Sequence, residues 1–173
     1  MRKLRVEEMD RLSVEAFKAE EKNDLIIVLD DIRSMHNVGA VLRTADAFLC
    51  KEVLLCGITP RPPHREIRKT AIGAEESVDW RHEPDILSAL LALKEKGYQL
   101  LAVEQAEGST QLPEFQPGPE VKYALIVGHE IDGVKQEVID ICDVCLEIPQ
   151  FGTKHSLNVS VATGIAMFHL TFR

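Results

Sequence analysis

The sequence predicts an α/β protein with a mostly parallel sheet and helices on both faces. Short apolar runs alternate along the chain with segments of helical periodicity, which is the pattern of a parallel sheet covered on both sides. The 173 residues suffice for one well-buried domain and hardly for two, and they contain no internal repeat or interdomain linker. We therefore predict a single domain over residues 25–173, preceded by an N-terminal helical extension over residues 1–24.

Five apolar runs are predicted to be strands, because each is short, aliphatic and bounded by polar or glycine-containing segments. They are LIIVLD (25–30), EVLLCG (52–57), YQLLAVE (98–104), YALIVG (123–128) and VCLEI (144–148), with a further short segment around SVDW (77–80). Helices are predicted at 84–96, where Gly97 supplies the stop, at 134–141, and from about Ser156 onward. Residues 105–120 are rich in Gly, Pro and Glu and are predicted to be an exposed loop.

A helix over residues 37–48, NVGAVLRTADAF, carries one arginine among small and apolar residues. Its apolar positions follow the i, i+3, i+4, i+7 spacing of a helix packed on a core (Val38, Val41, Leu42, Ala45, Phe48 and Leu49). Arg43 lies on the opposite side, where its small neighbours Gly39, Ala40 and Ala47 let something bulky approach. The alternative is a solvated arginine loosely paired with Asp46.

Composition bears on both location and partners. No apolar run approaches the ~20 residues of a transmembrane helix. The charged segment MRKLRVEEMDR has no apolar stretch of a secretory signal behind it, so we expect a cytoplasmic protein with no membrane partner. The net charge of −8 at first sight disfavours a nucleic-acid partner. However, residues 104–147 carry ten acidic and two basic residues, so this segment accounts for the whole excess of negative charge.

The segment TPRPPHREIRK (59–69) is predicted to be a proline-stiffened basic loop. It carries Arg61, Arg65, Arg68 and Lys69, with His64, against the single acid Glu66. Such a loop is suited to contact phosphates, and a solvated charged loop is the alternative.

The four cysteines (Cys50, Cys56, Cys142 and Cys145) are predicted to be reduced thiols rather than a disulfide framework. Cys142 and Cys145 form a C-x-x-C pair, which raises a zinc or redox interpretation. A structural zinc needs four ligands and the sequence has no second close pair, so we predict small buried residues and no metal.

Three polar loops follow predicted strands and form the candidate ligand site. They are IRSMHN (32–37), GHEIDG (128–133) and PQFGTKHSLN (149–158). In open α/β sheets, ligands bind beyond the carboxyl ends of the strands. The dinucleotide fingerprint, the P-loop and the G-x-S-x-G nucleophile elbow are all absent from the sequence.

The same loops carry three motifs that resemble, in order, those of the SpoU (TrmH-type) RNA ribose 2'-O-methyltransferases of the SPOUT superfamily. The motifs are Asn37 to Gly39 with Arg43 and Thr44, then IVGHEIDGV, then IPQFGTKHSLNVSVATGIA. The resemblance implies a SPOUT methyltransferase domain with a C-terminal trefoil knot, S-adenosylmethionine as methyl donor, and a homodimer with sites at the interface. His129 departs from the pattern, since family members often have asparagine there.

Position by position, the resemblance implies a catalytic role for Arg43 with Asn37 as its motif partner. It also implies cofactor contacts by Gly128, Ile148 and Leu157, and an active-site place for Glu130, Ser156 and Asn158. Taken singly, these residues have plainer interpretations. Asn37 can be a helix N-cap, Glu130 can face solvent, and Ser156 and Asn158 can cap the final helix.

The implied reaction is methyl transfer from S-adenosylmethionine to a ribose 2'-hydroxyl in tRNA or rRNA. We favour tRNA, because the chain has no room for the added RNA-binding domain of some rRNA enzymes. Arg43 is a poor base, since the guanidinium pKa lies above ~12, and we expect it to hold the adjacent phosphate and the 2'-oxygen. Two alternatives stay open: a non-catalytic RNA- or nucleotide-binding module of the same fold, and a small-molecule enzyme with another cofactor.

Overall fold

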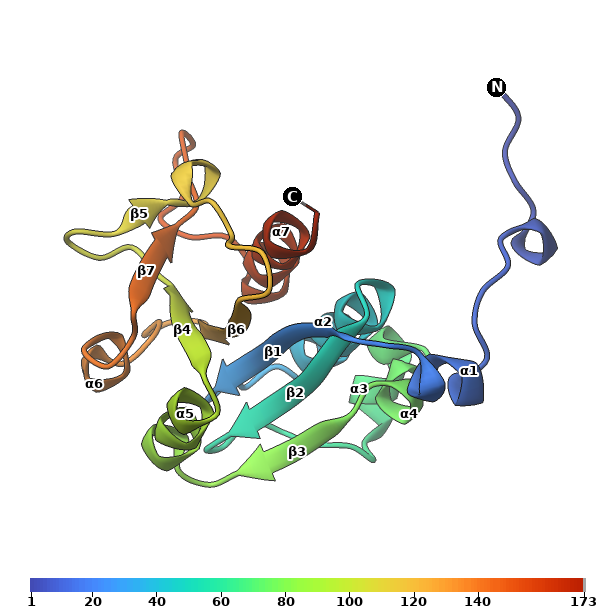
Figure 1. Ribbon diagram of the computed structural model, residues 1–173, viewed down its shortest axis with the longest axis horizontal. Helices are drawn as coiled ribbons and strands as arrows, with labels where there is room; N and C mark the ends of the chain where they lie inside the picture. The colour runs from blue at the N-terminus through green and yellow to red at the C-terminus, as the bar shows by residue number, and fades with distance from the viewer. Residues whose placement is uncertain (173) are drawn as a thin grey trace.

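The computed structural model describes residues 1–172. Within them, seven strands form one sheet in the order β3-β2-β1-β6-β4-β7-β5, and every neighbouring pair is parallel (Figure 1). The strands are β1 (Asn23–Asp30), β2 (Cys50–Cys56), β3 (Trp80–Glu83), β4 (Tyr98–Val103), β5 (Thr110–Gln111), β6 (Lys122–Val127) and β7 (Val144–Glu147). The predicted parallel α/β class is confirmed.

Helices cover both faces of this sheet. They are α1 (Val14–Ala19), α2 (Met35–Ala47), α3 (Arg65–Ala71), α4 (Ala74–Ser77), α5 (Ile86–Glu95), α6 (Gln136–Ile139) and α7 (Val159–Thr171), with 3-10 turns η1 (Val6–Glu8) and η2 (Leu112–Glu114). The sheet has a hydrophobic core on each face, and alternate residues of β1 pack into one core or the other. Ile27 and Leu29 pack with α1 to α4 and α7, whereas Ile26 and Val28 pack with α5 and α6.

The first turn of α2 begins one residue after Ser34, whose Oγ accepts a hydrogen bond from the backbone N–H of Asn37. The N-cap is therefore Ser34, and the N-cap interpretation of Asn37 is wrong. The predicted apolar stripe is buried as expected at Val38, Val41, Leu42 and Ala45. Its side chains seal the core under the helix that carries the first motif.

Four segments differ from the prediction. The basic segment 59–69 is loop only to His64, because residues 65–71 form α3. Residues 105–120 are not wholly irregular, since β5 pairs with β7 at the sheet edge and η2 buries Leu112. The segment around residues 77–80 divides between the end of α4 and the start of β3. The final helix starts at Val159 rather than near Ser156, because Asn158 provides its cap.

The C-terminal part of the chain crosses back over the sheet. β6 lies beside β1, the next strand β7 lies beyond β4, and α7 then returns to pack on α2 and β6. This path places the loops that follow β6 and β7 next to each other, at the carboxyl edge of the sheet. The two later sequence motifs therefore meet although thirteen residues separate them.

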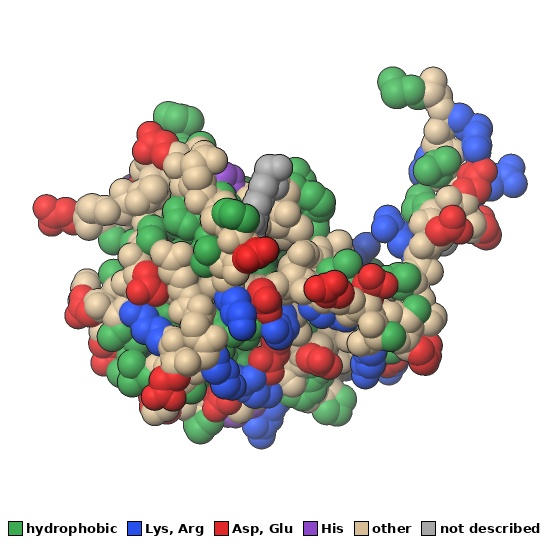
Figure 2. All heavy atoms as spheres, viewed as in Figure 1, with side chains coloured by type: hydrophobic (Ala, Val, Ile, Leu, Met, Phe, Trp, Pro, Cys, Tyr) green, Lys and Arg blue, Asp and Glu red, His purple; other side chains and the backbone are tan. Residues whose placement is uncertain are grey.

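The segment before α1 extends away from the body of the molecule (Figures 1 and 2). Its side chains are exposed outside η1, and Phe17 of α1 is the first residue to enter the core. Between residues 1 and 172, no helix is long and apolar enough to cross a membrane.

Candidate active site

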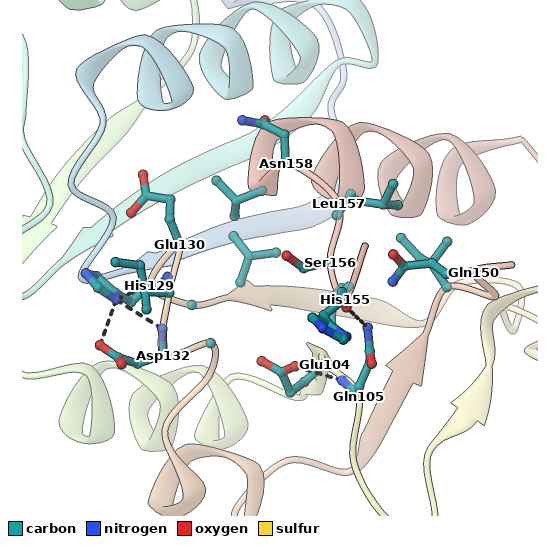
Figure 3. A pocket seen from close by; sticks show the side chains of 18 residues that line it. Glu104, Gln105, His129, Glu130, Asp132, Gln150, His155, Ser156, Leu157 and Asn158 are labelled. Carbon is teal, nitrogen blue, oxygen red and sulfur yellow. Dashed lines mark hydrogen bonds and ion pairs between the residues drawn. The ribbon is translucent and has the colours of Figure 1, made fainter. Parts of the chain in front are cut away.

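A hollow of about 510 Å³ lies at the carboxyl ends of β4, β6 and β7 (Figure 3). It is lined by residues from the three connections that follow these strands. Six of the residues singled out from the sequence line it: Gly128, Glu130, Ile148, Ser156, Leu157 and Asn158. Asn37 lies just outside the lining and is joined to it by hydrogen bonds to Glu130 and Asn158.

Glu130 joins the second loop to the start of α2. Its carboxylate accepts hydrogen bonds from the backbone N–H groups of Arg33 (3.0 Å) and Ser34 (2.9 Å) and from Nδ2 of Asn37 (3.0 Å). Burial acts to raise the pKa of Glu130, but these three hydrogen bonds outweigh it and the pKa lies below its ordinary value. The solvent-facing interpretation of Glu130 is wrong, because a half-buried carboxylate with three donors is a fixed acceptor.

The hydrogen bonds run in one direction from the third loop to the second. Asn158 Nδ2 donates to Asn37 Oδ1 at 3.2 Å, and Asn37 Nδ2 donates to Glu130. Asn158 Oδ1 in turn accepts from the backbone N–H of Ser160 at 2.9 Å, which caps α7. A backbone donor stands at one end and a carboxylate acceptor at the other, so neither amide can turn over without losing a partner. Asn158 is therefore a helix cap that also contacts the first motif.

Gly128 allows the second loop to fold back on itself. A Cβ atom at this position would lie 2.1 Å from the carbonyl oxygen of Gly133 and 2.4 Å from the nitrogen of Val134. Gly133 has a positive φ of 70°, a conformation that side chains disfavour. His129 pairs with Asp132 across the same turn at 2.9 Å. Both glycines are thus required by the compact shape of the loop.

Two residues of the site were missed from the sequence. Glu104 and Gln105 follow β4 and line the hollow beside His155 (Figure 3). From the sequence, Glu104 was assigned to the end of a strand and Gln105 to the start of an exposed loop. The rule that ligands bind at carboxyl ends of strands also applies to β4, and it would have identified them.

Arg43 does not line this hollow. It is exposed on α2 and borders a second hollow of about 500 Å³, whose other walls come from residues 10–14, α4 and neighbouring segments. Among residues 1–172 no ion pair joins Arg43 to Asp46, whose carboxylate instead accepts from Ser77 Oγ at 2.5 Å. The predicted open space beside Gly39 is wrong, because a Cβ there would lie 2.1 Å from Thr70 Oγ1 on α3.

The basic residues of segment 59–69 fall into two groups. Arg68 pairs with Glu76 at 2.9 Å, and Lys69 pairs with Glu66 at 2.7 Å. Arg61 and Arg65 are exposed and have no acidic partner within the described part of the chain.

The thiols of the C-x-x-C pair are protonated at neutral pH. Burial raises the pKa of Cys142 to about 12, and it also raises the pKa of Cys145. Cys145 Sγ lies 3.5 Å from the carbonyl oxygen of Glu104 and donates to it. Over residues 1–172, no group of three or more His, Cys, Asp or Glu side chains is arranged to hold a metal ion.

The 23S rRNA (guanosine-2'-O-)-methyltransferase RlmB of Vibrio cholerae is 32% identical over 150 residues, which are 87% of this chain and 60% of the relative. An AdoMet-bound rRNA methyltransferase from Sinorhizobium meliloti superimposes with a TM-score of 0.80 and 25% identity, over 89% of this chain and 59% of the other. The TrmH/SpoU tRNA modifying enzyme of A. aeolicus superimposes with a TM-score of 0.81 and 27% identity, over 91% of this chain and 80% of the other.

The chain spans about three fifths of the length of the first curated relatives that it matches. The SpoU rRNA methylase family matches residues 24–168, which include all three motifs and every strand of the sheet except the first residue of β1. The resemblance drawn from the motifs is thereby confirmed, and this chain belongs to the SpoU rRNA methylase family.

Proposed function

We propose that this protein is an S-adenosylmethionine-dependent methyltransferase that modifies a ribose 2'-hydroxyl in tRNA or rRNA. The observation that carries the proposal is the meeting of the second and third motif loops around one hollow, with Asn37 of the first motif joined to them through Glu130 and Asn158. The named activities of the relatives support the same reaction class. The proposed substrate agrees with the expected cytoplasmic location.

The hollow fits S-adenosylmethionine in size and charge. Its volume lies in the range of small-molecule sites. Glu104, Glu130 and Asp132 line it, and no Lys or Arg between residues 1 and 172 does so. Acidic walls suit a ligand with a sulfonium and an ammonium group and disfavour a phosphorylated one. The fit therefore supports this cofactor over the nucleotide-type cofactors of the small-molecule alternative.

We assign the two later loops to cofactor binding. Ile148 and Leu157 provide apolar wall, and the tight turn at Gly128 presents backbone groups to the ligand. When bound, S-adenosylmethionine supplies a methyl group on a positively charged sulfur. Asn158 lies on the side of the hollow nearest α2, where it contacts Asn37, and Ser156 precedes it on the same loop (Figure 3). The ribose would enter at this side.

We assign positioning rather than proton abstraction to Glu130. Three N–H groups already occupy its carboxylate, and its lowered pKa makes it a weak base. One N–H of the Asn158 amide is used by Asn37, which leaves the other for the substrate. Arg43, as a permanent cation, would hold the phosphate and the 2'-oxygen, so that the phosphate or another acceptor takes the proton.

The active form that we propose is a homodimer. One face of α7 exposes Val161, Ile165 and Phe168, with Phe172 beyond them, and Phe168 is 58% exposed. Phe48, the C-cap of α2, packs edge-on against Phe168 and Phe172, so this stripe continues onto the end of the helix that carries Arg43. Pairing of two copies over this surface would bury the stripe and bring Arg43 of one copy toward the hollow of the other. This arrangement would explain why Arg43 does not line the hollow of its own chain.

RNA phosphates are proposed to contact Arg61 and Arg65, because Arg68 and Lys69 are engaged by glutamates of the same chain. The double variant Arg61→Ala/Arg65→Ala should weaken RNA binding and reduce the slope of log affinity against log salt by about 2. The matched control Arg68→Ala/Lys69→Ala removes the same charge and should change the slope by less. Equal slopes for the two double variants would contradict the assignment.

The C-terminal crossing of β7 and α7 is proposed to be the trefoil knot that the family resemblance implies. A knot at this point would account for the path of the chain, in which β7 lies beyond β4 and α7 then returns to pack on β6 and α2. Such a crossing would hold the two cofactor loops against each other.

Two measurements test the function. Calorimetry with S-adenosylmethionine and its demethylated product should show stoichiometric binding. Incubation with labelled cofactor should transfer methyl groups to tRNA or rRNA at positions that then resist alkaline cleavage, and the two RNA pools assayed separately identify the substrate class. Absence of heat and of thermal stabilisation at millimolar cofactor would eliminate the methyltransferase. RNA binding without cofactor binding would instead favour the non-catalytic module.

A further inference from the structure

We propose that Glu104 and Gln105 form a clamp that holds the two cofactor loops in their binding positions. This inference rests on the proposed function, because it assigns S-adenosylmethionine to the hollow that both residues line. Neither residue belongs to the three motifs. Gln105 positions the third loop through a hydrogen bond, and Glu104 both adds negative charge to the wall of the hollow and positions the second loop through hydrogen bonds.

The backbone of Glu104 is fixed to β7 just beyond the last residue of β4. Its N–H donates to the carbonyl oxygen of Leu146 at 3.0 Å, and its own carbonyl accepts from Cys145 Sγ at 3.5 Å. Two neighbours on the adjacent strand therefore set the position of this residue. A side chain that starts from a fixed strand end can hold a loop more accurately than one that starts from another loop.

The Glu104 side chain holds the second loop. Oε2 accepts from the backbone N–H of Val134 at 2.8 Å, and Oε1 accepts from the backbone N–H of Gln105 at 2.8 Å. A Cβ atom on Gly133 would lie 2.1 Å from Oε2, so only glycine lets the carboxylate approach this closely. One carboxylate thus joins the end of β4 to the loop that contains Gly128.

The Gln105 side chain holds the third loop. Its Nε2 donates to the carbonyl oxygen of His155 at 2.6 Å, one residue before Ser156 (Figure 3). Residues 151–158 are otherwise exposed, and the contact of Asn158 with Asn37 lies at their far end. Gln105 therefore tethers a segment that the body of the protein covers poorly.

The two tethers are adjacent in sequence, and one of them supports the other. The N–H of Gln105 is itself held by the Glu104 carboxylate, which directs the Gln105 side chain toward the third loop. Loss of the clamp should increase the motion of both loops and weaken cofactor binding, because the protein must then order the loops when the ligand binds. The proposed RNA contacts of Arg43, Arg61 and Arg65 should not change.

The variants Glu104→Gln and Gln105→Met test the clamp. A carboxamide has one acceptor oxygen for two backbone donors, and methionine keeps the length of glutamine without a donor. Each should raise the cofactor Kd and the cofactor KM about tenfold, the ratio expected for one or two lost hydrogen bonds. Because the lost hydrogen bonds act on the cofactor loops, the change should appear in cofactor binding, and the KM for RNA should stay within about twofold of the wild type. Glu107→Gln and Gln116→Met are the controls, since both are exposed and make no side-chain hydrogen bond within the described residues.

Hydrogen exchange without cofactor tests the clamp separately from the proposed function. Glu104→Gln should speed exchange in residues 128–134 and also in 152–158, whereas Gln105→Met should speed it in 152–158 alone. Unchanged exchange in both loops, or faster exchange with an unchanged cofactor Kd, would overturn the inference. A lower Tm of the variants with an unchanged cofactor Kd would mean that Glu104 and Gln105 have only a structural role, and this result would also overturn the inference. A wild type that binds no cofactor would refute the proposed function, while the exchange pattern would still decide whether the clamp exists.

Discussion

Replacement of Glu130 by glutamine tests whether this side chain organises the site. The carboxylate receives three hydrogen bonds, two of them at Oε1. In its better orientation a glutamine keeps its oxygen toward Ser34 and Asn37 and turns its NH₂ group against the N–H of Arg33. At least one charge-assisted hydrogen bond is lost, and the remaining two become neutral.

The magnitude follows from this count. A hydrogen bond to a charged group contributes about 1.5–3 kcal/mol, and half-burial of Glu130 lets water replace part of it. We expect Glu130→Gln to lower the free energy of unfolding by about 1–3 kcal/mol and the Tm by roughly 3–10 °C. Asn37 and Asn158 lose their fixed orientation, so kcat for methyl transfer should fall about 10- to 100-fold.

The pH dependence gives a second, independent measurement. The pKa of Glu130 is lowered in the folded protein from its ordinary value of 4.5. The stabilisation by this carboxylate is therefore fully present above pH 4.5 and is lost as the pH falls through the lowered pKa. The Tm difference between wild type and Glu130→Gln should be constant near neutral pH and shrink in acid. Glu107→Gln, an exposed replacement of the same kind, should show neither effect. A Tm difference that does not change with pH, or wild-type kcat in Glu130→Gln, would refute this account of the site.

Three further substitutions test other parts of the fold and the site. Arg43→Ala removes an exposed side chain and keeps a good helix former, so the free energy of unfolding should change by about ±0.5 kcal/mol. The rate of single-turnover methyl transfer should fall about 10² to 10³-fold. A folded variant with the wild-type transfer rate would show that Arg43 is only a solvated charge. Gly39→Ala forces a Cβ against Thr70 on α3, and urea unfolding should show a loss of about 1–3 kcal/mol, whereas unchanged stability would mean that the two helices separate freely. Phe168→Asp places a charge on the exposed stripe of α7 and should give a monomer mass by light scattering with lower activity; a wild type that is already monomeric at micromolar concentration would argue against the dimer.

Local sequence was sufficient where one physical requirement dominates. The strands β1, β2, β4, β6 and β7 were all identified, because a strand covered on both faces of a parallel sheet is largely apolar. The buried stripe of α2 was identified for the related reason that a helix on a core needs apolar residues every third or fourth position. The stop of α5 followed from Gly97, whose φ is 83°.

Local sequence was insufficient where a residue's environment comes from a distant segment. Gly39 suggested open space for a nucleotide, whereas the approach of α3 fills that space. Asn37 was a suitable N-cap by residue type, whereas the course of the chain gives that position to Ser34. The short pairing of β5 with β7 could not be seen in a segment rich in Gly and Pro, since a two-residue edge strand has no periodicity.

The sequence by itself determined the parallel α/β class, the motif residues and the family, because these depend on residue type and order along the chain. The tertiary structure decided which of those residues meet. It joined Asn37 of α2 to Glu130 and to Asn158, which lie 93 and 121 residues further along the chain. It left Arg43 outside the hollow of its own chain. It also brought in Glu104 and Gln105, which no motif marks. The physical reason is that the hydrogen bonds of a loop residue are made across the carboxyl edge of the sheet, and the strand order, rather than the neighbouring sequence, determines which partners lie there.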